Sequence, residues 1–352
     1  IPPKERGRAV PHNTFHAFTL AAVIAVLLFI ARPIVSVVVQ SFYVEHSRIL
    51  TEVENCQPFG GCTKEVKVDA AATEKLKKEQ PLGQFNGIGT YLNRGHLAVA
   101  EIGEILADNS GLGDIVSRIY NLPFYKALAF TLVFCFVVTP LAMVLGFAIA
   151  LAVNTIPKLI KGPVIFFSLL PMIITPLVGS LILYWMIHPQ GIIGATLQDI
   201  FNDQSLTLRG SPVLTWASLL FYGVWTNAPF SFVVFYAGLQ TVPADTLESA
   251  MIDGASRWER IRFVILPHLA PLATFVALVQ LMDNFRVFEP IVGFSAEANA
   301  SSLSWMIYND LSGDAQLFGS AGATSVLTIV GVVILLMPVL IRTWREFNHK
   351  AV

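Results

Sequence analysis

Six long apolar stretches limit what this chain can fold into more than any other feature. They lie near residues 17–43, 123–153, 163–188, 213–239, 267–294 and 318–342. A helix that crosses a hydrocarbon core of about 30 Å needs roughly 20 apolar residues, and each stretch is long enough. Hydrophobic residues make up 54% of the chain and charged residues only 13%, which is far more apolar than a soluble domain of this size. The sequence therefore predicts an all-α, polytopic membrane protein with about six transmembrane helices.

Positive charges gather at alternate connections between these stretches. They are Lys4, Arg6 and Arg8 in the N-terminal tail, Lys158 and Lys161, Arg257, Arg260 and Arg262, and Arg342, Arg345 and Lys350 near the C-terminus. The short connections on the opposite side carry only Arg209. Because cytoplasmic connections carry an excess of lysine and arginine, both termini are predicted to be cytoplasmic.

The first stretch, 17–43, is expected to remain in the protein as a membrane anchor that follows a cytoplasmic tail, 1–16. It is too long for the apolar core of a signal peptide and has no clear small-residue cleavage site. A cleaved signal is the alternative. Within this stretch Arg32, directly before Pro33, either faces a wet cavity or extends toward the membrane surface.

Residues 44–122 are predicted to form an extracytoplasmic loop or small cap. It contains a polar helical patch at 70–79, and its tail, 101–120, has the pattern of one amphipathic helix along the outer surface. Cys56 and Cys62 bracket five residues, two of them glycines, and are expected to form a disulfide in this compartment. Metal binding is the alternative, but no further cysteine or histidine pair completes a tetrahedral site.

A polar segment between the fourth and fifth stretches carries two sets of helix-capping residues. Asp245 is placed to N-cap a short helix with Glu248 at its third position, and Gly254 suits a left-handed helix end. Ser256 and Glu259 have the spacing of a second capping box. Two short helices joined at a glycine, with three arginines beside a membrane, predict a docking element for a cytoplasmic partner.

The same segment resembles the EAA loop of permease subunits from binding-protein-dependent ABC importers. The matching residues are Glu248, Ala250, Gly254, Leu266 and Pro267, with the family's spacing intact, while Ser249 and Val264 depart from its pattern. In that family the loop docks into a cleft on the ATPase subunit. The resemblance implies that the matching residues, together with Asp253, couple this chain to an ATPase through a loop at 241–266.

Further motifs narrow this resemblance. FRVFEPI at 285–291 is similar to a stretch of the maltose and glycerol-3-phosphate type of sugar permeases, and AGLQTVPADTLESAMIDGAS resembles their approach to the EAA loop. Their Thr-Gly-Gly-Pro motif after the fifth span is replaced here by SAEANASS. The resemblance covers about residues 120–345 and, more weakly, the first stretch, whereas 44–122 has no counterpart.

The resemblance implies a transmembrane permease subunit of an ATP-driven importer that moves a sugar, polyol or glycosidic solute across the bacterial inner (cytoplasmic) membrane. Its permease core is 123–345, and a cytoplasmic tail follows at 346–352. The implied partners are a second permease subunit in a heterodimer, two ATPase subunits, an extracytoplasmic solute-binding protein and membrane lipid. No cofactor is expected in this chain, because ATP and Mg²⁺ are expected on the partner ATPase.

Ionisable residues within a membrane span are functional candidates, because they must pair or face a wet cavity. Asp283, Arg286 and Glu289 recur every three residues in the fifth stretch, which places them on one helical face where Arg286 can pair with either carboxylate. Gln280 and Asn284 extend this polar strip. The strip either lines the translocation path or forms a structural ladder that locks neighbouring spans together.

The fourth stretch offers a second set of candidates for the path. Tyr222, Trp225 and Asn227 combine aromatic faces with an amide, a mixture suited to a polyhydroxylated ligand. Packing is the alternative for the aromatic residues. Asn227 is the stronger candidate, because an amide in mid-span needs a partner and Pro229 frees a backbone carbonyl nearby.

Missing motifs exclude or weaken several other functions. The chain has no GxxxxGK(S/T) phosphate loop with which to hydrolyse ATP itself, and no HExxH or GxSxG motif for an intramembrane enzyme. A net charge of -1 without a concentrated basic surface gives no reason to expect a nucleic-acid partner. Two alternatives remain: a secondary transporter of a small polar solute, although no inverted repeat is visible, and a scaffold that recruits a cytosolic protein.

Overall fold

The protein is mostly helical in a computed structural model that describes residues 12–47, 49–56, 62–108, 111–203, 207, 210–313 and 316–349. Lys4, Arg6, Arg8, Arg209 and Lys350, on which part of the topology prediction rests, lie outside these residues. The chain divides into two compact units. One consists of Ile1–Asn93 with Asp310–Val326, and the other of Arg94–Asn309 with Leu327–Val352.

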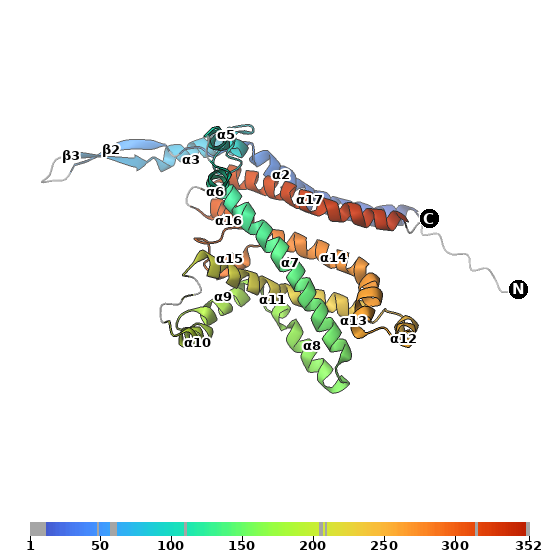
Figure 1. The fold of residues 1–352 in the computed structure, drawn as a ribbon. Helices are drawn as coiled ribbons and strands as arrows, with labels where there is room; N and C mark the ends of the chain where they lie inside the picture. Colours follow the sequence, from blue (N-terminus) through green and yellow to red (C-terminus); the bar gives the residue numbers. More distant parts are fainter. Residues whose placement is uncertain are drawn as a thin grey trace. The chain divides into compact units, whose positions relative to one another are not determined.

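The first unit begins with one long helical segment (Figure 1). It consists of α1 (His12–Val26), the π-helical turn η1 (Leu27–Ala31) and α2 (Arg32–Gln40). In η1 the Arg32 N–H bonds the Leu27 carbonyl, five residues back. Pro33 explains this bulge, because proline offers no N–H for the preceding turn and its ring crowds the carbonyl there. The Arg32 side chain is exposed.

Strands follow this helix, which corrects the all-α prediction for residues 44–122. β1 (Tyr43–Val44) pairs antiparallel with β4 (Gln84–Phe85). β2 (Leu50–Cys56) and β3 (Cys62–Val68) form an antiparallel hairpin with Leu50 opposite Val68 and Cys56 opposite Cys62. Both hairpin strands contain valine and threonine, whose branched side chains favour an extended backbone. The side chains of Cys56 and Cys62 lie outside the described residues.

The predicted polar helix at 70–79 is confirmed as α3 (Ala70–Glu79). Its N-cap is Asp69, whose Oδ1 accepts a hydrogen bond of 2.9 Å from the Ala72 N–H. A short helix, α4 (Gly89–Leu92), ends this part of the unit.

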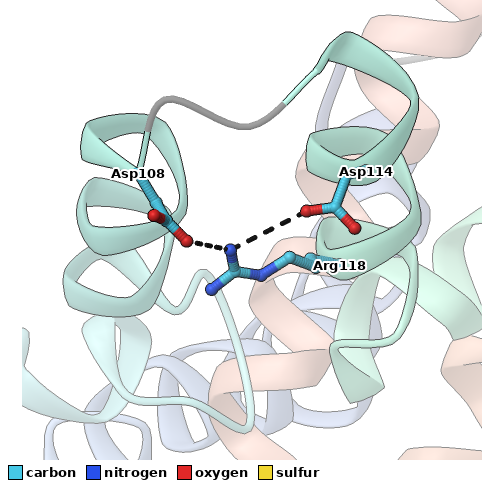
Figure 2. A network of polar contacts seen from close by, with 3 residues as sticks. All are labelled: Asp108, Asp114 and Arg118. Carbon is cyan, nitrogen blue, oxygen red and sulfur yellow. Dashed lines mark hydrogen bonds and ion pairs between the residues drawn. The ribbon is translucent and has the colours of Figure 1, made fainter.

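The amphipathic helix predicted at 101–120 is two helices, α5 (Val99–Ala107) and α6 (Leu112–Tyr120). The backbone is extended at Asp108 and again at Gly111, so one continuous helix cannot form. Figure 2 shows how Arg118 joins the pair. Its Nη1 lies 2.6 Å from Asp108 Oδ2 and 3.9 Å from Asp114 Oδ2. All three side chains are exposed, so this contact holds the two helices together only weakly.

The second unit is built around two long helices, α7 (Pro123–Thr155) and α11 (Pro212–Leu239). They pack closely along their length, and a Cβ at Gly223 would lie 2.6 Å from the Phe134 ring. Phe130, Phe134, Leu219 and Tyr222 form one buried cluster between them. Burial of such side chains contributes roughly 1.5–3 kcal/mol each relative to water, although lipid reduces this gain in a membrane.

The single span predicted at 163–188 is wrong, because the helix breaks before Pro176. The observed helices are α8 (Lys158–Ile173), α9 (Pro176–Ile187) and α10 (Ile192–Phe201). Thr175 has extended φ/ψ angles, as steric contact with a following proline favours. Figure 1 draws α8 and α9 as separate helices.

The fifth predicted span, 267–294, ends earlier than expected. Its observed parts are α13 (Arg257–Arg260), the π-helical turn η2 (Ile261–Ile265) and α14 (Leu266–Phe285), with α12 (Ala244–Ile252) before them. The bulge η2 again precedes a proline, Pro267. The remaining helices are α15 (Glu289–Gly293), α16 (Leu303–Ser312) and α17 (Phe318–His349).

The number of predicted spans is confirmed within the described residues. Six helices are long and apolar enough to cross a membrane: Thr19–Gln40, Pro123–Thr155, Pro176–Phe201, Pro212–Leu239, Arg257–Phe285 and Phe318–Arg342. The third of these begins only at Pro176, so α8 precedes it as a separate shorter helix.

Candidate functional site

The predicted capped loop forms two short helices joined at a glycine. Gly254 has a φ of 80°, and its N–H bonds the Met251 carbonyl while the Ala255 N–H bonds the Ala250 carbonyl. These two bonds make a Schellman motif that ends α12. The left-handed conformation predicted for Gly254 is therefore confirmed, and Ala250 supplies a backbone acceptor to the turn.

The capping box predicted at Ser256 and Glu259 is confirmed. The Ser256 N–H donates to Glu259 Oε2 at 2.7 Å, and the Glu259 N–H donates to Ser256 Oγ at 3.3 Å. The N-cap predicted at Asp245 is wrong, since Pro243 caps α12 and Asp245 lies in its first turn. Proline fixes φ near the helical value, so the helix begins earlier and Glu248 lies beyond the capping position.

The loop exposes apolar side chains that the sequence analysis did not single out. Ile252 is 86% exposed and Trp258 65% exposed, one on each of the two short helices. Glu248 and Asp253 are also exposed. Leu266 and Pro267 begin α14 directly after the π-helical turn. The sequence could have indicated Ile252 and Trp258, because both are large apolar residues in a capped and largely polar segment.

A cavity of about 450 Å³ lies among the helices of the second unit. Its walls come from α7, α9, α11, α14, the turn after α14 and the start of α15: Phe134, Pro176, Tyr222, Gly223, Thr226, Asn227, Asp283, Asn284, Arg286, Val287, Glu289 and Pro290. Five of the seven residues predicted for the substrate path line it. The other two, Trp225 and Gln280, do not.

Three charged residues line this cavity: Asp283, Arg286 and Glu289. Arg286 Nη2 lies 2.7 Å from Asp283 Oδ1, and the two side chains are 62% and 50% exposed, so the predicted pairing of Arg286 with Asp283 is present. The continuous helical face predicted through Glu289 is wrong, because α14 ends at Phe285 and Glu289 begins α15. The turn nevertheless keeps Glu289 at the cavity wall.

The other two members of the predicted polar strip, Gln280 and Asn284, are buried and tie helices together. Gln280 Nε2 donates to the Asn227 carbonyl at 2.9 Å and to Ser231 Oγ at 2.7 Å, which joins α14 to α11. Asn284 Nδ2 donates to Thr139 Oγ1 at 2.9 Å, which joins α14 to α7. The predicted strip thus has a structural part at Gln280 and a cavity part at Asp283, with Asn284 belonging to both.

The residues of α11 that were predicted to line the substrate path also include one with a structural role. Tyr222 Oη donates to the Pro176 carbonyl at 2.5 Å and its ring packs against Phe294 and Trp225, so this residue fixes α11 to α9. Asn227 Nδ2 donates to the Gly223 carbonyl at 2.8 Å. Thr226, which the sequence analysis missed, lines the cavity beside Asn227.

These features are typical of a multi-span permease subunit: a cavity lined by polar groups among its helices, and a separate capped loop that exposes apolar side chains. Residues 140–345 match the protein family described as the inner membrane component of binding-protein-dependent transport systems, and the chain belongs to that family. The predicted resemblance is therefore confirmed. The protein is a permease subunit of an ABC importer in the inner membrane, and in this family ATP hydrolysis belongs to a separate subunit.

Known relatives agree with this family. The chain is 28% identical to the trehalose/maltose transport system permease protein MalF of Thermococcus litoralis, over 62% of this chain and 75% of that one. It is 31% identical to the trehalose transport system permease protein SugA of Mycobacterium tuberculosis, over 57% of this chain and 64% of that one. A chain in the crystal structure of a bacterial ABC transporter involved in alginate import has the same fold, with a TM-score of 0.59 at 21% identity. The match covers 77% of the present chain and 95% of the chain in that crystal structure.

Proposed function

We propose that the chain moves a sugar, polyol or glycosidic solute, and that the cavity beside Asp283 and Arg286 forms part of its path. The cavity is the observation that carries this proposal, because it gathers side chains from five separate elements. Relatives whose names specify trehalose, maltose or lactose transport support the solute class.

The walls of the cavity fit a polyhydroxylated ligand. The ion pair of Asp283 and Arg286 is half exposed, so its remaining donors and acceptors are open to solute hydroxyls. The Asn227 and Thr226 side chains add polar groups, and Phe134 gives an apolar wall. A volume of about 450 Å³ is within the usual range of small-ligand sites, roughly 300–1,000 Å³.

The loop at 241–266 would be the docking element for the ATPase subunits. Glu248, Ala250, Asp253, Gly254, Leu266 and Pro267 are the residues proposed to couple the two proteins. The exposed Ile252 and Trp258 extend this surface with apolar area that a partner would bury. Closure of two ATPase subunits on ATP and Mg²⁺ would stabilise one state of the permease over the other.

Docking to a cytoplasmic ATPase also fixes a topology. Six crossings with this loop between the fourth and fifth would leave both termini in the cytoplasm and 44–122 outside. The proposed segments are a tail at 1–16, a first span at 17–43, the cap, a permease core at 123–345 and a tail at 346–352. A second permease subunit, forming a heterodimer, and an extracytoplasmic solute-binding protein complete the proposed complex.

A disulfide between Cys56 and Cys62 would close the outer hairpin. The two residues are direct partners in the strand register. Opposite residues in an antiparallel pair have Cα atoms about 4.5–5.5 Å apart, within the range that a disulfide spans.

Reconstitution tests the proposed function. The complex, rebuilt in vesicles with its ATPase and its binding protein, should take up a labelled sugar only with ATP, and vanadate should block uptake. Uptake driven by an ion gradient without ATP would instead indicate a secondary transporter. A complex that binds the ATPase but moves no solute would indicate a scaffold.

A further inference from the structure

The first unit contains a second cavity that the transport path does not use. It has a volume of about 650 Å³ and lies outside the family's matched region except for three residues, Gln316, Leu317 and Phe318. The other walls come from the ends of α2, β1 and β3, the residues after β1, and α3 with the turn that follows it. All of these segments belong to the same compact unit.

The cavity is held in shape by contacts between segments that are distant in sequence. The β1–β4 ladder joins Val44 to Gln84, and Gln40 Nε2 donates to the Leu82 carbonyl at 3.2 Å. The Gly319 N–H donates to Glu45 Oε1, and Gly319 lies so close to the Tyr43 carbonyl that a side chain there would clash. The cavity is thus preorganised rather than formed by a loose loop.

A buried histidine gives this cavity a polar group with unused bonding capacity. His46 is only 8% exposed, and its Nε2 lies 3.1 Å from the Gln80 carbonyl. Its Nδ1 is buried and has no hydrogen-bond partner among the described residues. Leaving a buried group of this kind unpaired is unfavourable, and a ligand hydroxyl that reaches it would satisfy it.

The other wall residues limit the chemistry of the ligand. Polar groups of both kinds are present: the carboxylates of Glu45 and Glu74, the ammonium of Lys77 and the amide of Gln316. Two carboxylates against one ammonium disfavour an anion. No group of three or more histidine, cysteine, aspartate or glutamate residues that could hold a metal ion occurs in the described part of the chain.

We infer that this cavity is a second saccharide site, in which the donors and acceptors around Glu45, His46 and Lys77 bind the hydroxyls of a neutral sugar. An apolar wall that includes Phe318 would cover a face of the sugar ring. The solute class rests on the proposed function, and the position of the site outside the membrane rests on the proposed topology. The site would hold solute on the extracytoplasmic side independently of the path cavity.

Hydrogen exchange on the assembled complex in nanodiscs, without binding protein, tests this inference with maltose and trehalose as probes. Either sugar should slow amide exchange at residues 70–83 and 316–321. No protection there with either sugar overturns the inference. Protection by choline but not by either sugar also overturns it, because the site would then select organic cations.

A matched pair of double variants on α3 localises the effect. Glu74→Gln with Lys77→Gln removes two wall charges, whereas Glu79→Gln with Lys75→Gln makes the same change on residues that do not line the cavity. The first pair should raise the sugar concentration needed for half-maximal protection by about tenfold, and the second should leave it near the unsubstituted value. Equal effects of both pairs would overturn the site.

Transport separates this inference from the proposed function. If the inference alone is wrong, the complex takes up sugar with ATP but shows no protection in the first unit. If the proposed function alone is wrong, ATP-driven sugar uptake is absent while protection at 70–83 remains.

Discussion

At the scale of single residues, burial divides side chains that the sequence pattern had joined. Gln280 and Asp283 lie one helical turn apart, yet Gln280 is buried between helices while Asp283 is half exposed in the cavity. A periodicity of 3.6 residues predicts that both share a face, but it does not distinguish a wet wall from a dry contact. The difference arises because α11 covers Gln280 through Ser231 and the cavity opens at the next turn.

This division predicts different outcomes for two substitutions. Asp283→Asn keeps the side-chain shape and breaks only an exposed ion pair, so the thermal stability of the complex should change little. Its uptake of sugar should fall by about tenfold, equivalent to about 1.4 kcal/mol of lost interaction with solute. Vesicle uptake and thermal unfolding of the same preparation measure the two effects.

Gln280→Met supplies the contrast. It leaves Ser231 Oγ and the Asn227 carbonyl without their buried donor, at a cost of roughly 1–3 kcal/mol. The midpoint of thermal unfolding should therefore fall. If Asp283→Asn unfolds as readily as Gln280→Met, the ion pair is a structural ladder and the proposed path is wrong.

At the scale of elements, the sequence predicted long helices and caps better than breaks. Ser256, Glu259 and Gly254 each act through bonds within a few residues, and all three were predicted correctly. The break before Pro176 and the early end of α14 were missed, because apolar content continues through both points. The β2–β3 hairpin was missed as well, because its strands are short and carry only a weak strand pattern within a polar segment.

The turn between the two short helices of the loop gives a sharp prediction. No atom lies within 4 Å of where a Cβ at Gly254 would be, so substitution there acts through the backbone alone. Gly254→Val should disfavour the left-handed turn by roughly 1 kcal/mol or more, reducing both ATPase co-purification and uptake while membrane insertion stays normal.

Gly254→Asn is the matched control, because asparagine tolerates the left-handed conformation far better than valine. It should retain most ATPase binding and uptake. Full transport by Gly254→Val would remove the loop from the coupling role.

The β2–β3 hairpin allows a chemical test of the proposed disulfide. If Cys56 and Cys62 are bridged, thiol reagents added to unfolded, non-reduced protein should modify only Cys135, the buried free cysteine. Reduction should expose two further thiols, which mass spectrometry would count. Modification of all three cysteines without a reductant would exclude the bridge.

At the scale of the whole molecule, the properties of the membrane explain which features could be predicted from the sequence. The number of spans was predictable because each helix must satisfy its own backbone hydrogen bonds in lipid, which imposes a minimum apolar length. The path cavity was only partly predictable. Its walls join Phe134, Pro176 and Glu289 across more than 150 residues, and no local pattern encodes contacts of that range.

Orientation in the membrane is the property of the whole chain on which the proposed docking loop and the proposed cap both depend. In a background of Cys56→Ser and Cys62→Ser, single variants Lys75→Cys, Arg257→Cys and Arg345→Cys place exposed thiols on the cap, on the loop and beyond the last span. Cys135 is buried in the folded protein and should stay unlabelled in every sample.

An impermeant maleimide added to intact, outer-membrane-permeable cells should label Lys75→Cys alone. Arg257→Cys and Arg345→Cys should become labelled only after the inner membrane is opened. The proposed loop contacts a cytoplasmic ATPase, and the two crossings that follow it return the tail to the same side of the membrane. Labelling of Arg257→Cys from outside would invert the topology, and with it the docking of the ATPase. Labelling of Arg257→Cys and Arg345→Cys from opposite sides would mean an odd number of crossings between them, against the two helices observed there.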